Sequence, residues 1–94
     1  MPAYLIGHIT VKDPDKWKKY VEGVKKSLAP FEAQIIFRGT RAAVLAGAHP
    51  HRQTVVIRFP DQATLQQWYL SPAYQGLIPV RDAAADVVII SYDA

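Results

Sequence analysis

Strands that are apolar on both of their faces are the feature that most constrains the fold of this chain. Residues 4–11 read YLIGHITV and residues 86–92 read DVVIISY, with β-branched and aromatic side chains at odd and at even positions. Successive side chains of a strand point to opposite faces of its sheet, so both faces of these strands need a cover. Helices of a small domain can supply one cover, and the other face needs a second one.

Capping signals predict helices between these strands. Asp13-Pro14 and Ser71-Pro72 each combine an N-cap residue with a proline suited to the first helical position, and Asp61 is a further N-cap. Each predicted helix carries an apolar stripe at helical spacing. Strands are expected at residues 4–11, 34–39, 53–59 and 86–92, while residues 42–47 predict either a hairpin partner or an extended arm.

The resulting order is strand, helix, strand, strand, helix broken into two, strand. This order predicts one α+β domain over residues 1–94, with a ferredoxin-like βαββαβ fold and a four-stranded antiparallel sheet. A chain of 94 residues has no segment left to cover the second sheet face. We therefore expect a homodimer that packs sheet against sheet, as in a dimeric α/β barrel.

Composition excludes several classes of site and partner. The chain has no cysteine, which excludes disulfides, thiolate metal sites and cysteine nucleophiles. Its net charge of +3 comes from dispersed basic residues, so no nucleic-acid partner is expected. No apolar stretch approaches the ~20 residues of a membrane span, and the N-terminus lacks the features of a signal peptide. A cytoplasmic location without a membrane partner is therefore expected.

Alternation assigns the strand side chains to the two faces of the sheet. Five apolar residues are expected to face the helices: Ile35, Phe37, Val55, Ile57 and Phe59. The opposite parity is expected on the open face: Tyr4, Ile6, His8, Gln34, Ile36, Arg38, Thr54, Val56 and Arg58. A cavity that combines these two arginines with Tyr4 and His8 would suit a small organic acid, because the guanidinium fork binds a carboxylate with two hydrogen bonds.

These residues are compatible with two functions. In an enzyme, Arg38 would hold the anion, and His8 or Tyr4 would transfer a proton or polarise a carbonyl. His8 and Tyr4 are therefore the catalytic candidates. In a non-catalytic dimeric sensor or accessory module, Arg38 and Arg58 would instead pair with carboxylates across the interface. A structural, hydrogen-bonded His8 fits that alternative.

The segment SPAYQGLIPVRDAAAD, residues 71–86, adds further candidates. Tyr74 and Arg81 fall on one helical stripe, so the arginine is expected to point toward the protein. A buried guanidinium needs a partner, and we favour a structural bond to Asp13 over one to the adjacent Asp82. Ser71 is explained by capping better than by nucleophilic catalysis. The ligand-binding candidates are Arg38, Arg58, Ser71, Tyr74 and Arg81.

No metal or cofactor is expected. His49 and His51 form an H-x-H pair in a basic loop, and two ligands are too few for a metal site.

Three stretches together resemble a known family. They are PAYLIGHITVKDPDKWKKY, FRGTRAAVLAG and VVIRFPDQATLQQWYLSPAYQGLIPVRDAAADVVII, which cover nearly the whole chain in this order. The sequence resembles the domain-of-unknown-function family 1330 (DUF1330) of the dimeric α/β-barrel superfamily. The resemblance implies the ferredoxin-like fold and the sheet-to-sheet dimer. It implies no reaction, since relatives in the wider superfamily include cofactor-free monooxygenases, haem-degrading enzymes, isomerases and stress-response proteins.

The resemblance also singles out residues. The recurring polar positions of the family correspond to Tyr4, Asp13, Tyr20, Arg38, Ser71, Tyr74 and Arg81, with Gly39 and Gly47 at turns. The chain departs from the family pattern at Glu32-Ala33 and at Ala46, where the family has glycines and an acidic residue. The loss of a carboxylate at position 46 leaves a nearby arginine freer to bind a ligand.

Overall fold

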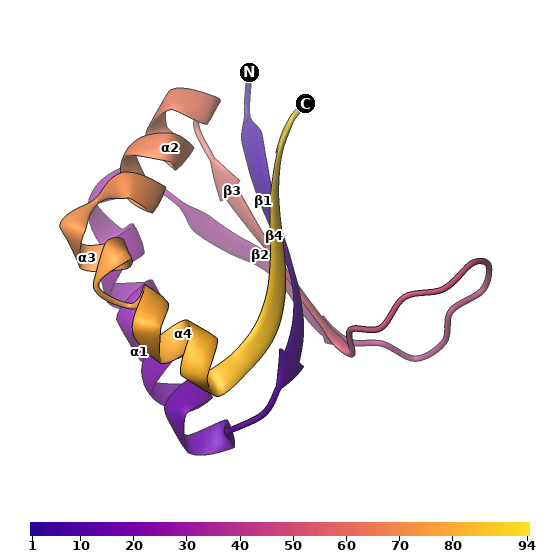
Figure 1. The fold of residues 1–94 in the computed structure, drawn as a ribbon. Helices are drawn as coiled ribbons and strands as arrows, with labels where there is room; N and C mark the ends of the chain where they lie inside the picture. Colours follow the sequence, from indigo (N-terminus) through magenta and orange to yellow (C-terminus); the bar gives the residue numbers. More distant parts are fainter.

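A four-stranded antiparallel sheet with its helices on one face forms the framework of the computed structural model, which describes residues 1–94 (Figure 1). The strands are β1 (Ala3–Val11), β2 (Gln34–Thr40), β3 (Gln53–Phe59) and β4 (Ala85–Asp93). The helices are α1 (Pro14–Leu28), a 3-10 turn (Ala29–Phe31), α2 (Gln62–Leu70), α3 (Pro72–Gln75) and α4 (Ile78–Ala84).

The strand order is β2-β3-β1-β4, and every neighbouring pair is antiparallel. The predicted α+β class and the ferredoxin-like order of elements are confirmed. The sheet is open, with β2 and β4 at its edges, so one copy of the chain does not form a barrel. None of the helices combines the length and apolar character needed to cross a membrane.

The predicted caps begin the helices. Asp13 Oδ1 accepts the backbone N–H of Lys16 at 3.2 Å at the start of α1, and Asp61 Oδ1 accepts that of Thr64 at 2.7 Å at the start of α2. These bonds satisfy N–H groups that a helix leaves without an intrahelical partner.

The segment expected to form the third helix is two short helices, α3 and α4. Pro79 lies in the first turn of α4. A proline inside a continuous helix removes one hydrogen bond and clashes with the carbonyl four residues earlier, so the helix ends at Gln75 and restarts. The break still leaves Tyr74 fully buried, because α3 packs its side chain toward the sheet.

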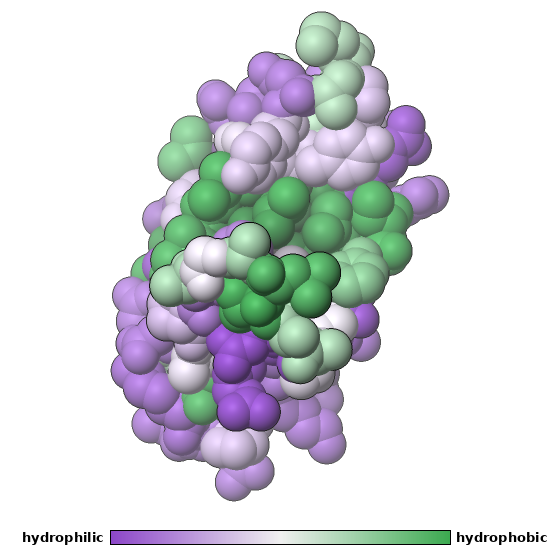
Figure 2. All heavy atoms as spheres, turned by 90° about the vertical axis from the view of Figure 1, so that its right-hand side faces the viewer, coloured by the Kyte–Doolittle hydropathy of each residue, from purple (hydrophilic) through white to green (hydrophobic).

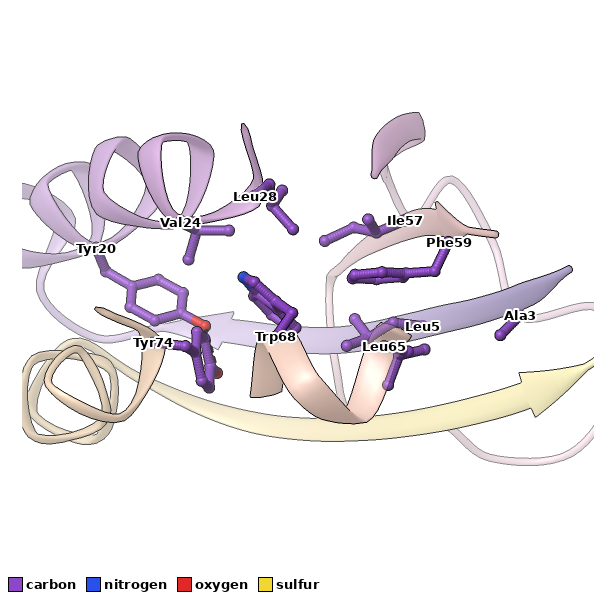
Figure 3. Close-up of a cluster of buried hydrophobic side chains, with 10 residues drawn as sticks. All are labelled: Ala3, Leu5, Tyr20, Val24, Leu28, Ile57, Phe59, Leu65, Trp68 and Tyr74. Carbon is purple, nitrogen blue, oxygen red and sulfur yellow. Dashed lines mark hydrogen bonds between the residues drawn. The ribbon is translucent and has the colours of Figure 1, made fainter. Parts of the chain in front are cut away.

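The core fills the space between the helices and the sheet (Figure 3). Its members are Ala3, Leu5, Tyr20, Val24, Leu28, Ile57, Phe59, Leu65, Trp68 and Tyr74. The Trp68 ring lies 5.5 Å from that of Phe59 and 4.4 Å from that of Tyr74, and its Nε1–H donates to the buried Ser27 hydroxyl at 2.9 Å. Burial of these large rings supplies the main stabilisation of the protomer.

The opposite sheet face has no cover. Figure 2 looks onto this side of the molecule, where hydrophobic residues gather in a band across the middle. Large side chains on the strands here are substantially exposed: Ile36, Phe37, Val88, Ile90 and Tyr92. Only 15 of the 94 residues are buried, because the helices cover one face of the sheet and the other face is open.

Residues 41–52 form an arm that extends away from the sheet on its open side (Figure 1). Of the two predicted alternatives for residues 42–47, the extended arm is confirmed, since no strand forms there. At the base of the arm, the Arg41 N–H donates to the carbonyl of Arg52 at 2.6 Å, and the Arg52 N–H donates to Ile9 at 3.2 Å.

Candidate functional site

A cavity of about 330 Å³ lies between the helix-covered face of the sheet and the helices. Nineteen residues line it, thirteen of them hydrophobic. The residues that give it chemical character are Trp17, Tyr20, Arg38, Thr40, Trp68 and Tyr74. This volume is within the range of cavities that hold small molecules, and the lining is mainly apolar with a few polar groups, as such sites require.

A β-bulge at Ile36 decides which residue of β2 reaches this cavity. Ile35 pairs with Ile57, but Phe37 pairs with Val56, so Ile36 is an extra residue in the strand. The expectation from alternation was therefore wrong from this point onward. Phe37 faces the open side, while Arg38 turns to the helix-covered side. A bulge places two residues of one strand opposite one residue of the neighbouring strand. Each later residue of the bulged strand therefore faces the side opposite to the one that alternation predicts.

Arg38 is the only charged residue in the cavity lining. Its side chain is exposed and takes part in no salt bridge, so the guanidinium marks the open end of the cavity without a carboxylate partner. The closed end is marked by Trp68 and Tyr74, which are buried.

Three polar side chains form a connected group at the closed end. The hydroxyls of Tyr20 and Tyr74 are 2.8 Å apart, and Arg81 Nη1 donates to the Tyr74 hydroxyl at 3.0 Å. The same Nη1 has a long contact of 3.5 Å with the Tyr69 hydroxyl. Arg81 itself does not line the cavity, because Tyr74 stands between.

The carboxylate partner of Arg81 is Asp82. Arg81 Nε donates to Asp82 Oδ1 at 3.1 Å, whereas Asp13 caps α1 and approaches Lys16. The expectation of a bond to Asp13 was wrong, because the long arginine side chain bends along α4 and reaches Asp82, the next residue in the sequence. The Arg81 side chain is only 13% exposed, with its Nε bonded to Asp82 and its Nη1 in contact with the two tyrosines.

Burial and hydrogen bonding fix the charges of this group. Burial raises the pKa of Tyr20, and the neighbouring Tyr74 raises it further, against the opposing effect of Arg81. Burial opposes the charge of Arg81, but hydrogen bonds to Tyr69, Tyr74 and Asp82 outweigh it and raise its pKa. Near neutral pH, Tyr20 is thus a neutral hydroxyl beside a permanent cation.

The two residues expected to be catalytic lie on the other side of the sheet. Tyr4 pairs with Arg58 and His8 with Thr54, and none of these side chains joins the group at the closed end of the cavity. His8 Nδ1 is 3.2 Å from the Thr54 hydroxyl. The sheet therefore separates Tyr4, His8 and Arg58 from Arg38, with which they were expected to share a face.

The three histidines of the chain gather at this open side. The rings of His8 and His49 are 4.7 Å apart, those of His49 and His51 are 5.7 Å apart, and His51 Nδ1 is 2.9 Å from the Thr10 hydroxyl. Burial lowers the pKa of His8, and so do the nearby His49 and His51. No group of three or more such side chains has an arrangement that could hold a metal ion.

Ser71 has a structural role at the start of α3. Its hydroxyl accepts the N–H of Tyr74 at 3.3 Å and donates to the carbonyl of Trp68 at 2.6 Å. Sequence reasoning from the residues alone did not select Tyr20 as a site residue. Its position on the apolar stripe of α1 marks it only as core, and its contact with Tyr74 joins residues that are 54 positions apart.

Several solved structures share this fold. The RPA0582 protein of unknown function from Rhodopseudomonas palustris superposes with a TM-score of 0.85 at 13% identity, covering 99% of this chain and 82% of that one. A dimeric ferredoxin-like protein of unknown function from Jannaschia sp. CCS1 has a TM-score of 0.70 at 13% identity, with both chains covered completely. SnoaB, a cofactor-independent oxygenase from Streptomyces nogalater, has a TM-score of 0.69 at 12% identity, covering 99% and 92%.

At these identities the likeness concerns the fold alone. No curated protein matches the sequence. The family model for a domain of unknown function, DUF1330, matches residues 2–93. That match spans nearly the whole sequence and agrees with the three resembling stretches. The chain belongs to the DUF1330 family.

Proposed function

We propose that this protein is a homodimer that binds a small organic acid in the cavity between the sheet and the helices, with the carboxylate at Arg38. The observation that carries the proposal is a mainly apolar cavity of about 330 Å³ whose lining contains a single charged residue, a cation without a carboxylate partner. An apolar body would fill the cavity, and its anionic end would remain at the mouth.

Arginine at the mouth favours a carboxylate over a neutral ligand. Its planar fork matches a carboxylate with two charge-assisted hydrogen bonds, which are about twice as strong as neutral ones. The exposed position of Arg38 lets a ligand reach it without first burying an unpaired charge.

The dimer part of the proposal rests on the open face of the sheet. Side chains such as Val88 and Ile90 are 44% and 38% exposed, and a second copy would remove this apolar surface from water. Two of the similar solved structures are described as dimeric ferredoxin-like proteins. Two open sheets packed face to face would form a barrel-like core. Tyr4, His8 and Arg58 would then lie in the interface instead of the ligand site.

The second candidate is a non-catalytic sensor or accessory module with structural arginines. One observation favours it for Arg81: its largely buried side chain already bonds to Asp82, Tyr69 and Tyr74. Arg38 has no carboxylate partner of this kind. The likeness to SnoaB, a cofactor-independent oxygenase at 12% identity, supports the fold alone. We therefore propose binding of an acid and assign no reaction.

The test measures binding of benzoate by isothermal titration calorimetry and by the fluorescence of Trp17 and Trp68, which line the cavity. Arg38→Ala should weaken binding at least about tenfold, since it removes a charge-assisted pair. Arg58→Ala is the matched control, because it removes the same charge from the other face and should leave affinity unchanged. Equal affinity of the Arg38→Ala variant and the unaltered protein would overturn the proposal. Native mass spectrometry of both variants checks the dimer separately.

A further inference from the structure

We propose that the Tyr20 hydroxyl is a directed hydrogen-bond donor into the cavity, and that the bound acid is an oxo acid whose carbonyl oxygen accepts this bond. This inference rests on the proposed function and adds to it the chemical class of the ligand. It follows from the direction of the hydrogen bonds at the closed end of the cavity.

The direction begins at Arg81. A guanidinium has five N–H donors and no acceptor, so the 3.0 Å contact between Arg81 Nη1 and the Tyr74 oxygen has one sense only. The Tyr74 oxygen accepts. Its own proton must then be donated to another group.

Tyr20 is the acceptor that the structure offers to Tyr74. Their oxygens are 2.8 Å apart, and no other hydrogen-bond partner of Tyr74 is close enough to take its proton. Both side chains line the cavity, but the reverse sense would leave the unpaired proton on Tyr74, which is 0% exposed, whereas Tyr20 keeps 7% exposure. Because an unpaired buried donor costs about 1–3 kcal/mol, the bond runs from Tyr74 to Tyr20.

The proton left over belongs to Tyr20. Its oxygen accepts from Tyr74, it makes no second hydrogen bond within the protein, and its side chain lines the cavity. Burial raises the pKa of Tyr20, so the hydroxyl keeps this proton near neutral pH. The Arg81 guanidinium polarises the hydroxyls of Tyr74 and Tyr20 and makes the Tyr20 hydroxyl a stronger donor.

A neutral acceptor fits this position better than a second carboxylate. Arg38 is the only charged residue in the lining, and Arg81 lies behind Tyr74. A carboxylate at the closed end would lose its hydration without an ion-pair partner. A carbonyl oxygen loses less and gains a hydrogen bond from Tyr20.

The experiment compares two probes of nearly equal shape by isothermal titration calorimetry. The 3- and 4-acetylbenzoates carry a ketone, and the corresponding isopropylbenzoates carry a methyl group and a hydrogen in place of the ketone oxygen. The unaltered protein should bind the better acetyl isomer about fivefold to tenfold more tightly than its isopropyl counterpart. Tyr20→Phe should abolish this preference and leave the affinity for the isopropyl compound unchanged.

Tyr69→Phe is the control variant. Tyr69 also contacts Arg81 but has no bond to Tyr20, so this variant should keep the preference. A carbonyl-labelled acetylbenzoate gives an independent readout, because a hydrogen bond moves its ¹³C resonance downfield. The shift should occur in the unaltered protein and in Tyr69→Phe, and disappear in Tyr20→Phe.

The outcomes separate the two proposals. Equal binding of both probes to the unaltered protein, or a preference that survives in Tyr20→Phe, would overturn the directed donor while organic acid binding stands. Absence of binding by every probe and by benzoate would overturn both. The comparison of probes on the unaltered protein needs no variant. It therefore still tests the directed donor if the Tyr20→Phe protein does not fold.

Discussion

Phenylalanine side chains on the two faces of the sheet differ strongly in burial. Phe59 on the helix-covered face is 1% exposed, whereas Phe37 on the open face is 54% exposed and its ring lies against Gly39. Both are phenylalanines on adjacent strands. The difference shows that burial here depends on what covers a face, and that the open face of a single copy is apolar and uncovered.

The sharpest test of this contrast substitutes each phenylalanine in turn. Phe59→Ala should lower the free energy of unfolding by about 3–5 kcal/mol, since it removes a fully packed ring. Phe37→Ala should cost about 1 kcal/mol or less at protein concentrations where the protomers are separate. Urea denaturation followed by circular dichroism measures both, and equal losses for the two variants would contradict a one-sided core.

A charge on the open face tests whether a second copy covers it. Ile90→Asp places a carboxylate opposite Ile6, where the proposed dimer would bury it without a partner. We expect the dissociation constant of the dimer to rise more than about a hundredfold while the protomer stays folded. Light scattering after size-exclusion chromatography gives the mass. A dimer of unchanged stability would remove the open face from the interface.

A smaller effect is expected from acid on the same face. The pKa of His8 is lowered in the folded protein by burial and by His49 and His51, so the unfolded chain binds its proton more readily. The contribution of His8 to stability is complete above its ordinary pKa near 6.5 and is lost as the pH falls below it. The urea midpoint should therefore decrease between about pH 7.5 and 5.5.

His8→Gln is the comparison for this titration. Glutamine keeps a hydrogen-bonding group beside Thr54 and does not titrate, so the decrease should be shallower than in the unaltered protein. An identical pH dependence in the two proteins would assign the effect to other groups.

The smallest effect should come from deletion of Ile36, the extra residue of the bulge. Without it, Ile35, Phe37 and Arg38 would face Ile57, Val56 and Val55 in regular alternation, which are the pairings they already have. Benzoate affinity should therefore stay within about threefold of that of the full chain, because each pairing partner is unchanged. A folded protein that has lost binding would mean that the bulge itself orients Arg38.

The parts of the fold that follow local rules were predictable from the sequence. Asp13, Asp61 and Ser71 cap the helices as expected, because capping depends on residues three positions apart. The faces of β1 and β3 also follow from alternation, since each strand is regular along its length.

The parts of the site that depend on irregular or distant contacts were not predictable. The stretch QIIFRG is apolar at successive positions, so its pattern does not reveal a bulge at Ile36, and Arg38 was expected on the wrong face. The bond between Tyr20 and Tyr74 joins α1 to α3 across the core, and no local signal announces it. Sequence patterns determine local structure, whereas the cavity is formed by residues from distant segments.

The bulge in β2 also affects how this chain should be aligned with its relatives. An added residue that is absorbed by a bulge changes the number of codons in a strand without changing which side chains line the cavity. Two related proteins can therefore present the same cavity wall although their strands differ in length by one residue. An alignment that places no gap at Ile36 would match Arg38 with the neighbouring position of a shorter relative, and the anion-binding role proposed for Arg38 would be transferred to a residue on the opposite face.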